Sequence, residues 1–247
     1  GLDMDMVSEG LLNTLGNSVK EGIISEQQIT EACRRILEAK FKLGLFDDPY
    51  KYCNDDRAKR EVFSDANRAE ARSTATQSFV LLKNTDNVLP IKKSGTIALG
   101  GPLADAKENM TGTWSVAARF SESISVLEGL KKAVGTNAKI VYAKGSNLTE
   151  DEVLENNSTL FGKSLNRDKR TAVQLRDEAV RIAKNADVIV AAVGEAAEMS
   201  GEAASRTNME IPETQKELLK AVLKTGKPVV LVLFTGRPLA LAWEEEN

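Results

Sequence analysis

The sequence contains no histidine at any of its 247 positions. This absence excludes the Ser-His and Cys-His pairs of nucleophilic hydrolases and removes the commonest metal ligand of proteins. The two cysteines, Cys33 and Cys53, do not form a metal-binding spacing. Unpaired thiols are expected, with a bridge between the two as the alternative, and two cysteines indicate little about the cellular compartment. We therefore expect neither a metal nor a cofactor, and acid–base chemistry would fall mainly to carboxylates.

The chain also lacks a strong excess of charge and a long apolar run. Its net charge of −3 gives no general attraction to nucleic acid or to anionic membranes, and no apolar stretch approaches the ~20 residues of a membrane span. Hydrophobic residues make up 42% and charged residues 28%, as in ordinary soluble globular proteins. The first residue is Gly1 and no signal peptide is visible, so we expect an excised or processed piece of a longer protein.

The N-terminal part favours helices separated by a polar segment. One helix is expected over residues 7–20, and a second begins at a capping box in which Ser25 caps the helix and Gln28 reaches back to it. Residues 47–63 are rich in charged and turn-forming residues and predict a linker. A further helix is expected over residues 65–77.

Later in the chain, apolar runs of β type alternate with amphipathic stretches of helical type. This alternation predicts βαβ units and a parallel sheet, and the nearly continuous apolar runs indicate a sheet covered on both faces. The expected class is an α/β three-layer sandwich, and the early end of the chain after its last run suggests a truncated sheet. The runs cover residues 96–99, 139–142, 187–193 and 229–234, and the helical stretches cover 123–134, 171–186 and 213–224.

The segment from Val193 to Arg206 concentrates ionisable side chains. It follows the third apolar run and holds Glu195, Glu198 and Glu202. In parallel α/β sheets the loops after the carboxyl ends of strands carry the chemistry, and a glutamate there can serve as a proton donor. The alternative is that all three glutamates are solvated loop carboxylates.

A series of short motifs runs nearly from end to end of the chain. They stand at residues 1–6 (Gly-Leu-Asp-Met-Asp-Met), 41–49, 78–84 with 89–90, 112–115 (Gly-Thr-Trp-Ser), 193–195, 200–206 with 211–212, and 234–238 (Phe-Thr-Gly-Arg-Pro). No single motif is decisive, but the ordered set is specific and resembles bacterial β-glucosidases of glycoside hydrolase family three. The first two motifs resemble the end of the family's (β/α) barrel, and the others resemble its second domain with the substrate loop and the acid/base loop.

The resemblance implies a two-domain enzyme that removes non-reducing-end sugars with retention. In the family a barrel carries an aspartate nucleophile, typically in a Ser-Asp-Trp context, and an α/β sandwich supplies the acid/base glutamate. No Ser-Asp-Trp occurs here, because the Ser-Asp at residues 64–65 is followed by Ala66. A (β/α) barrel needs ~250 residues by itself. Residues 1–46 are therefore expected to be its C-terminal remnant, 47–77 a linker with a connecting helix, and 78–247 the sandwich.

The resemblance also suggests which glutamate is the acid/base. Glu202, in the Ser-Gly-Glu motif, matches the family's acid/base loop best. Glu195, at the strand end, is the runner-up, and Glu198 is a weaker candidate.

Three further residues are candidates for substrate binding. Ser115 matches a position that hydrogen-bonds the bound sugar in the family. Trp114 could stack on a sugar face or pack at a domain interface. Arg206 could orient Glu202 or another loop carboxylate through its planar fork, or it could form a surface ion pair.

The expected function is that of a fragment of a retaining exo-β-glycosidase, most simply a β-glucosidase acting on terminal β-D-glucosyl residues. Its partners would be a β-linked oligosaccharide or glucoside and the missing barrel in cis, so the fragment alone should be inactive. The alternatives are a non-catalytic α/β carbohydrate-binding module and an assembly role, in which an exposed apolar face could drive homo-oligomerisation. The export of many bacterial relatives favours the periplasm.

Overall fold

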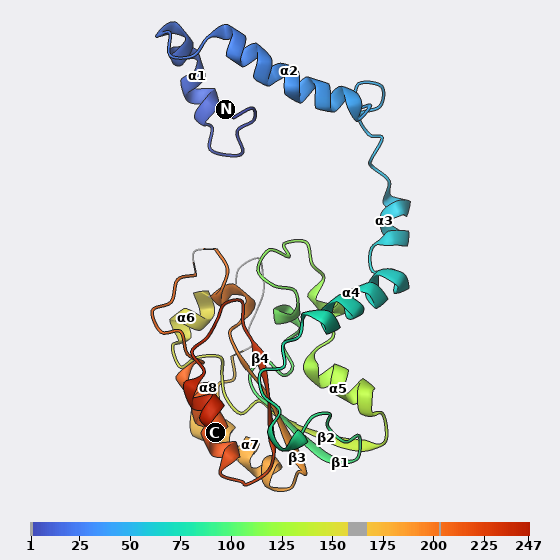
Figure 1. The fold of residues 1–247 in the computed structure, drawn as a ribbon, viewed down its shortest axis with the longest axis vertical. Coiled ribbons are helices and arrows are strands. Elements are labelled where there is room, and N and C mark those ends of the chain that lie inside the picture. Colours follow the sequence, from blue (N-terminus) through green and yellow to red (C-terminus); the bar gives the residue numbers. More distant parts are fainter. Residues whose placement is uncertain (1, 158–166, 203) are drawn as a thin grey trace. The chain divides into compact units, whose positions relative to one another are not determined.

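Two compact units, Gly1–Val80 and Leu81–Asn247, make up the computed structural model of the chain (Figure 1). The structure describes residues 2–157, 167–202 and 204–247. The first unit is helical and the second contains the sheet.

The first helix of the N-terminal unit, α1 (Gly10–Lys20), begins later than the sequence predicts. Val7 and Glu9 adopt left-handed backbone conformations, with φ of 71° and 55°, which a helix cannot include. The Asp5 carboxylate accepts a hydrogen bond from the Leu11 amide at 3.0 Å and so satisfies one of the open donors of the first turn. A local acidic cap, rather than the apolar pattern, therefore sets where α1 begins.

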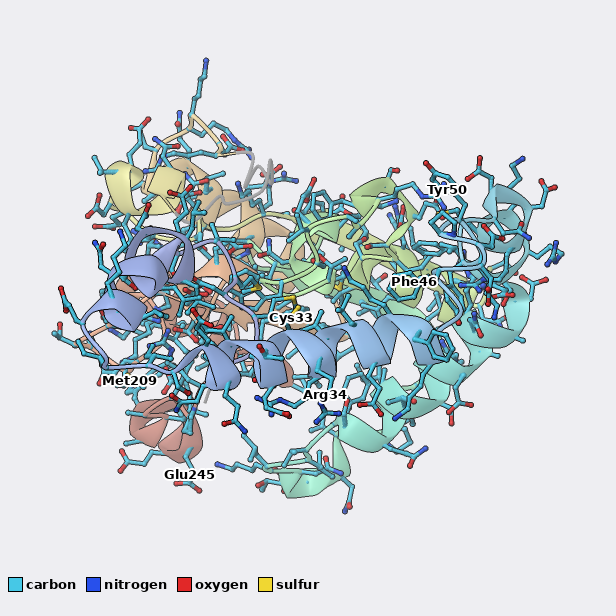
Figure 2. All side chains as sticks on the ribbon, turned by 90° about the horizontal axis from the view of Figure 1, so that it is seen from above. Cys33, Arg34, Phe46, Tyr50, Met209 and Glu245 are labelled. Atoms are coloured by element: carbon cyan, nitrogen blue, oxygen red, sulfur yellow. The ribbon has the colours of Figure 1, made fainter. Side chains whose placement is uncertain are left out.

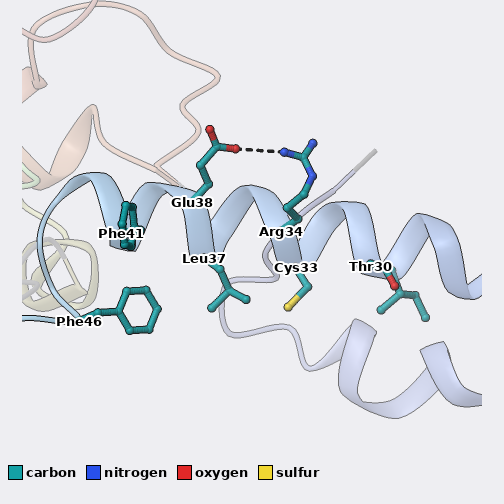
Figure 3. Close-up of a pocket in the computed structure, with 8 residues that line it drawn as sticks. Thr30, Cys33, Arg34, Leu37, Glu38, Phe41 and Phe46 are labelled. Atoms are coloured by element: carbon teal, nitrogen blue, oxygen red, sulfur yellow. Dashed lines mark hydrogen bonds and ion pairs between the residues drawn. The ribbon is translucent and has the colours of Figure 1, made fainter.

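The second helix, α2 (Glu26–Lys42), begins at the predicted capping box. The Ser25 hydroxyl accepts from the Gln28 amide at 3.2 Å, and the Gln28 side chain accepts from the Ser25 amide at 2.8 Å. One apolar row of α2 contains Cys33, Leu37 and Phe41 and, with Phe46 beyond the helix, lines a pocket (Figure 3). Leu37, Phe41 and Phe46 are 45%, 71% and 61% exposed, so the described residues of the N-terminal unit do not cover this row.

The face of α2 next to this row is charged. Arg34 pairs with Glu31 at 2.8 Å and with Glu38 at 3.1 Å, and Lys42 pairs with Glu38 at 2.8 Å. Figure 2 shows Cys33 and Arg34 projecting from different sides of the helix. The helix is therefore amphipathic.

The polar segment expected to be a linker contains a short helix, α3 (Asp55–Glu61). Asn54 caps it by accepting from the Arg57 amide at 2.8 Å. Acidic residues stand in its first turn and basic residues in its last turn, which suits the helix dipole. None of its residues is buried, so the sequence has no apolar periodicity that would predict this helix. The next helix, α4 (Asp65–Ser78), lies where it was predicted.

The C-terminal unit is built on a four-stranded parallel sheet, which confirms the α/β class. The spatial order of the strands is β2-β1-β3-β4, with helices on both faces (Figure 1). The strands are β1 (Gly95–Gly100), β2 (Ala138–Ala143), β3 (Val188–Gly194) and β4 (Val229–Phe234), and the helices are α5 (Val126–Val134), α6 (Glu152–Asn157), α7 (Ala172–Lys184), α8 (Glu213–Leu223) and α9 (Ala242–Glu246).

Alternate residues of each strand feed two cores, one on each face of the sheet. On one face, Ile97 and Leu99 of β1 pack with Val190 of β3 against Leu127 and Val134 of α5. The other face packs against α7 and α8. Its buried members are Ala98, Ala143, Ala179, Ala183, Ala186, Ile189, Leu218 and Val222.

The direction of the chain crossovers changes between β1 and β3. From β1 the chain crosses to β2 on one side, and from β3 it crosses to β4 on the other side. The connections that follow β1 and β3 therefore run in opposite directions from the carboxyl edge of the sheet. Gly101 allows the loop after β1 to pass close to the backbone of β3, since an added Cβ would lie 2.0 Å from the Ala192 carbonyl oxygen. Ligands of open α/β sheets bind in the crevice at such a switch point.

A surface ion cluster precedes α7. Asp168 accepts from the Arg170 guanidinium at 2.7 Å, and Arg170 also donates to Glu178 of α7 at 2.7 Å. Hydrogen bonds from Arg170 lower the pKa of Asp168 to about 2. Because the folded-state value is below the ordinary one, this carboxylate stabilises the fold above about pH 4, and the contribution is lost as the pH falls towards 2.

We therefore expect Asp168→Asn to lower the free energy of unfolding by at most about 1 kcal/mol at about pH 6, because the pair is partly solvated. The difference from the unsubstituted chain should be much smaller at about pH 2, where this carboxyl is half protonated in the folded state. Urea unfolding at the two pH values measures it, with the exposed Asp177→Asn as control. A loss of equal size at both pH values would contradict this interpretation.

Candidate active site

Three loops meet at the carboxyl edge of the sheet, one after each of β1, β3 and β4. The 3-10 turn Ala197–Met199 in the loop after β3 packs into a small apolar cluster with the loops after β1 and β2. This cluster contains Leu103, Ala106, Leu148, Ala196 and Met199. The first half of the loop after β3 is thus anchored in the fold.

Glu195, directly after β3, is enclosed by two arginines. Its side chain is 0% exposed, and its Oε1 lies 2.6 Å from Nη1 of Arg206 and 3.3 Å from Nε of Arg237. Thr235 donates to its Oε2 at 3.3 Å. A carboxylate that is desolvated and surrounded in this way is stabilised by its partners but has no open face for a ligand.

Arg206 is used within the same cluster. Its Nη2 donates to the Glu210 carbonyl oxygen at 3.1 Å, while its Nη1 binds Glu195. Of the roles expected for Arg206, the structure shows the binding of a loop carboxylate, and that carboxylate is Glu195.

Glu202 lies in the second half of the loop after β3, in a turn, and is exposed to solvent. The preceding residue, Gly201, stands against the loop after β1, since an added Cβ would lie 2.4 Å from Cγ2 of Thr113. Glu198, in contrast, is buried in the 3-10 turn. Among the three candidate glutamates, Glu202 is therefore the one that solvent reaches freely. Ala203, within the same motif, lies outside the described residues.

Trp114 and Ser115 lie on the loop after β1 that adjoins the loop of Glu202. The Thr113 hydroxyl donates to the Ala197 carbonyl at 2.6 Å, and the Asn109 side chain accepts from the Ala197 amide at 2.8 Å. Trp114 is 64% exposed. The Ser115 hydroxyl donates to the Gly112 carbonyl at 2.8 Å. The structure thus brings the loops of Glu202, Trp114 and Ser115 together at one edge of the sheet.

Two residues that sequence reasoning did not select shape this edge. Gln215 of α8 is wholly buried, and its side-chain amide bonds both backbone groups of Gly194 (2.8 and 2.9 Å) and the Leu148 carbonyl (2.7 Å). Arg237 follows β4 and donates to the Met199 carbonyl and, at 2.7 Å, to the Ala204 carbonyl. The only sequence signals were a polar residue at a buried helical position and an arginine in the last motif.

Within the parts of the chain that the structure describes, three or more His, Cys, Asp or Glu side chains nowhere gather in a way that could hold a metal ion. In the same residues, no helix is both long and apolar enough to cross a membrane. Both cysteines are free.

Comparison with known proteins places the chain in a family. Residues 79–247 match the model of the glycosyl hydrolase family 3 C-terminal domain. A periplasmic β-glucosidase of Salmonella typhimurium is 44% identical over all of this chain and 33% of its own length, and a β-xylosidase of Formosa agariphila is 35% identical with the same coverage. The crystal structure of a β-glucosidase from Listeria innocua superposes with a TM-score of 0.81 at 34% identity, over 100% of this chain and 30% of that one.

The chain spans about one third of the length of these relatives. The match extends from end to end, and both the sequence motifs and the parallel sheet agree with it, which confirms the resemblance. This chain belongs to glycosyl hydrolase family 3 and carries the C-terminal domain of that family.

Proposed function

We propose that this chain is part of a retaining β-glucosidase and supplies its acid/base, Glu202. The observation that carries the proposal is the position of Glu202, exposed on a loop that is anchored at the carboxyl edge of the sheet. β-Glucosidases among the relatives make terminal β-linked glucose the simplest substrate.

Retention requires two carboxyl groups about 5–5.5 Å apart. In the first step a carboxylate nucleophile attacks the anomeric carbon while the acid donates its proton to the departing glycosidic oxygen. In the second step the same residue, now a base, takes a proton from the water that displaces the enzyme carboxylate. No Ser-Asp-Trp occurs in this chain, so the aspartate nucleophile would come from a barrel domain elsewhere in the full-length enzyme.

The geometry favours Glu202 over the other two candidates for the proton donor. A general acid must come within hydrogen-bond reach of the oxygen that it protonates. Glu195 is enclosed by two arginines and Glu198 is buried, whereas Glu202 is open to solvent. Glu195 would therefore hold the loops through its two arginines, and Glu202 would be the carboxyl group that a substrate can reach.

Trp114 and Ser115 would form part of the sugar site. An exposed indole offers a flat apolar surface on which a sugar ring can stack. The Ser115 hydroxyl can donate to a sugar hydroxyl in place of its bond to Gly112. Both lie on the loop that contacts the loop of Glu202, so one bound sugar could meet all three residues.

The N-terminal unit would join the barrel to the sandwich. Its helix α2 exposes the apolar row of Cys33, Leu37 and Phe41, and a surface of this kind needs a cover in a stable protein. We assign that cover to the barrel in cis. The name of the Salmonella relative supports a periplasmic location.

The stereochemistry of hydrolysis tests the proposal. The full-length enzyme should release the β-anomer of glucose first from an aryl β-glucoside, as proton NMR in the first minutes would record, because two inversions restore the configuration. The 247-residue chain alone should release no glucose, because it lacks the nucleophile. Initial release of the α-anomer, or hydrolysis by the chain alone, would contradict the proposal.

A further inference from the structure

We propose that Arg237 is a positioning residue for Glu202, a proposal that rests on the proposed function. Arg237 lies in the loop after β4, and its guanidinium donates to the carbonyls of Met199 and Ala204. These two carbonyls stand on either side of Glu202 in the chain. One rigid group therefore holds both ends of the turn that presents the proton donor.

The Glu202 turn needs such a restraint because its own side chains cannot supply it. Ser200 and Gly201 precede Glu202 and bring no large apolar side chain to bury. A segment that buries little apolar surface is fixed mainly by its hydrogen bonds, and its backbone carbonyls need donors. Both carbonyls accept from one nitrogen, Nη2, while Nε of the same rigid guanidinium faces Glu195. A lysine ammonium has no second nitrogen at a fixed distance and cannot serve both places.

Arg237 is itself held by the sheet. Its Nε lies 3.3 Å from the buried carboxylate of Glu195. The Glu195 amide donates to the Phe234 carbonyl at 2.8 Å, so the ends of β3 and β4 are joined where the arginine begins. The Arg237 amide donates to the Thr235 hydroxyl at 3.1 Å. One side chain thus links the Glu202 turn to the ends of the neighbouring strands β3 and β4.

The residue before Arg237 lies very close to the loop after β3. Gly236 lies so near Ser200 that an added Cβ would stand 2.1 Å from its hydroxyl oxygen. Any side chain at Gly236 would push the turn that carries Arg237 away from the loop after β3. A substitution at Gly236 leaves the charges of Arg237 and Glu195 unchanged, so it is a second and independent way to disturb the contact between Arg237 and the loop after β3.

Arg237→Lys in the full-length enzyme tests the proposal. Lysine keeps a positive charge, but its single ammonium cannot stand beside the Glu195 carboxylate and bind both carbonyls at once, as Nε and Nη2 of Arg237 do. We expect kcat/KM for cellobiose, whose leaving group needs a proton, to fall about 10- to 100-fold, because a misplacement near 1 Å can cost ~10² in rate. For 2,4-dinitrophenyl β-glucoside, whose leaving group departs without a proton, we expect less than about a 3-fold loss.

The matched control is Arg167→Lys. Arg167 also binds a buried glutamate, Glu155, and also donates to two main-chain carbonyls, those of Thr149 and Glu150, but these do not flank Glu202. Its replacement should affect both substrates equally. If Arg237→Lys does not yield folded protein, Gly236→Ala should show the same dependence on leaving group.

The outcomes separate this proposal from the proposed function. The double variant Arg237→Lys/Glu202→Gln should be no slower on cellobiose than Glu202→Gln, because a donor that is absent cannot be misplaced. Equal losses on both substrates for Arg237→Lys, no loss at all, or additive losses in the double variant would overturn the positioning role. If Glu202→Gln itself showed no dependence on leaving group, the proposed acid/base would fail instead.

Discussion

Glu202→Gln in the full-length enzyme is expected to lower kcat/KM for cellobiose by about 10²- to 10⁴-fold, the usual contribution of a positioned general acid. Glutamine has nearly the same shape but carries no transferable proton, so the glucose leaving group must depart as an alkoxide. An activated 2,4-dinitrophenyl β-glucoside forms a stable phenolate, and its kcat/KM should fall less than about 10-fold. Steady-state kinetics on the two substrates measure the difference.

The second half of the reaction gives an independent signature of Glu202→Gln. Without a base to deprotonate water, the covalent glucosyl-enzyme should accumulate, and a burst of dinitrophenolate should precede slow turnover. Azide is an anionic nucleophile that needs no deprotonation, so it should restore turnover and give β-glucosyl azide. The exposed Glu213 of α8 is the control, and Glu213→Gln should leave both substrates unchanged. A uniform loss on both substrates without azide rescue would contradict the assignment.

The strands could be predicted closely because their signal is local. Apolar runs placed β4 at its observed residues, Val229–Phe234, and the other three strands within one or two residues at each end. Ser25 placed the start of α2, because a cap and the amide that donates to it are close in sequence. The exposed helix α3 was missed, since helices without a buried face leave no apolar periodicity.

The partners of the site residues could not be predicted because they depend on the order of strands in space. Glu195 and Arg237 meet only because β3 and β4 are neighbours, so that residues 42 positions apart, from 195 to 237, share one strand edge. The pattern of apolar runs gives the strands but not their order. The choice of Glu202 came from the family motif, and the structure adds that it is exposed while Glu195 is enclosed.

Replacement of Glu195 by glutamine should cost about 3–5 kcal/mol of folding free energy, the usual effect of removing one partner of a buried ion pair. The side chains of Arg206 and Arg237 are only 16% and 19% exposed, so neither guanidinium can recover its hydration when the carboxylate charge is lost. Glutamine fills the same volume and can still accept hydrogen bonds, so the loss reports mainly the charge. Urea unfolding of the 247-residue chain, followed by circular dichroism of the sheet unit, measures it.

Two further variants separate the effect of the Glu195 charge from the effect of its side-chain length. Glu195→Asp keeps the charge but is one methylene shorter, so it cannot meet both arginines, and an intermediate loss is expected. Glu217→Gln removes a carboxylate that pairs with Lys220 at the surface, where both side chains are more than a third exposed, so solvent screens the pair and the free energy of unfolding should hardly change. If Glu195→Gln cost no more than this surface control, the carboxylate at the end of β3 would not hold the surrounding loops in place. The argument that Arg237 positions the Glu202 turn would then lose its support.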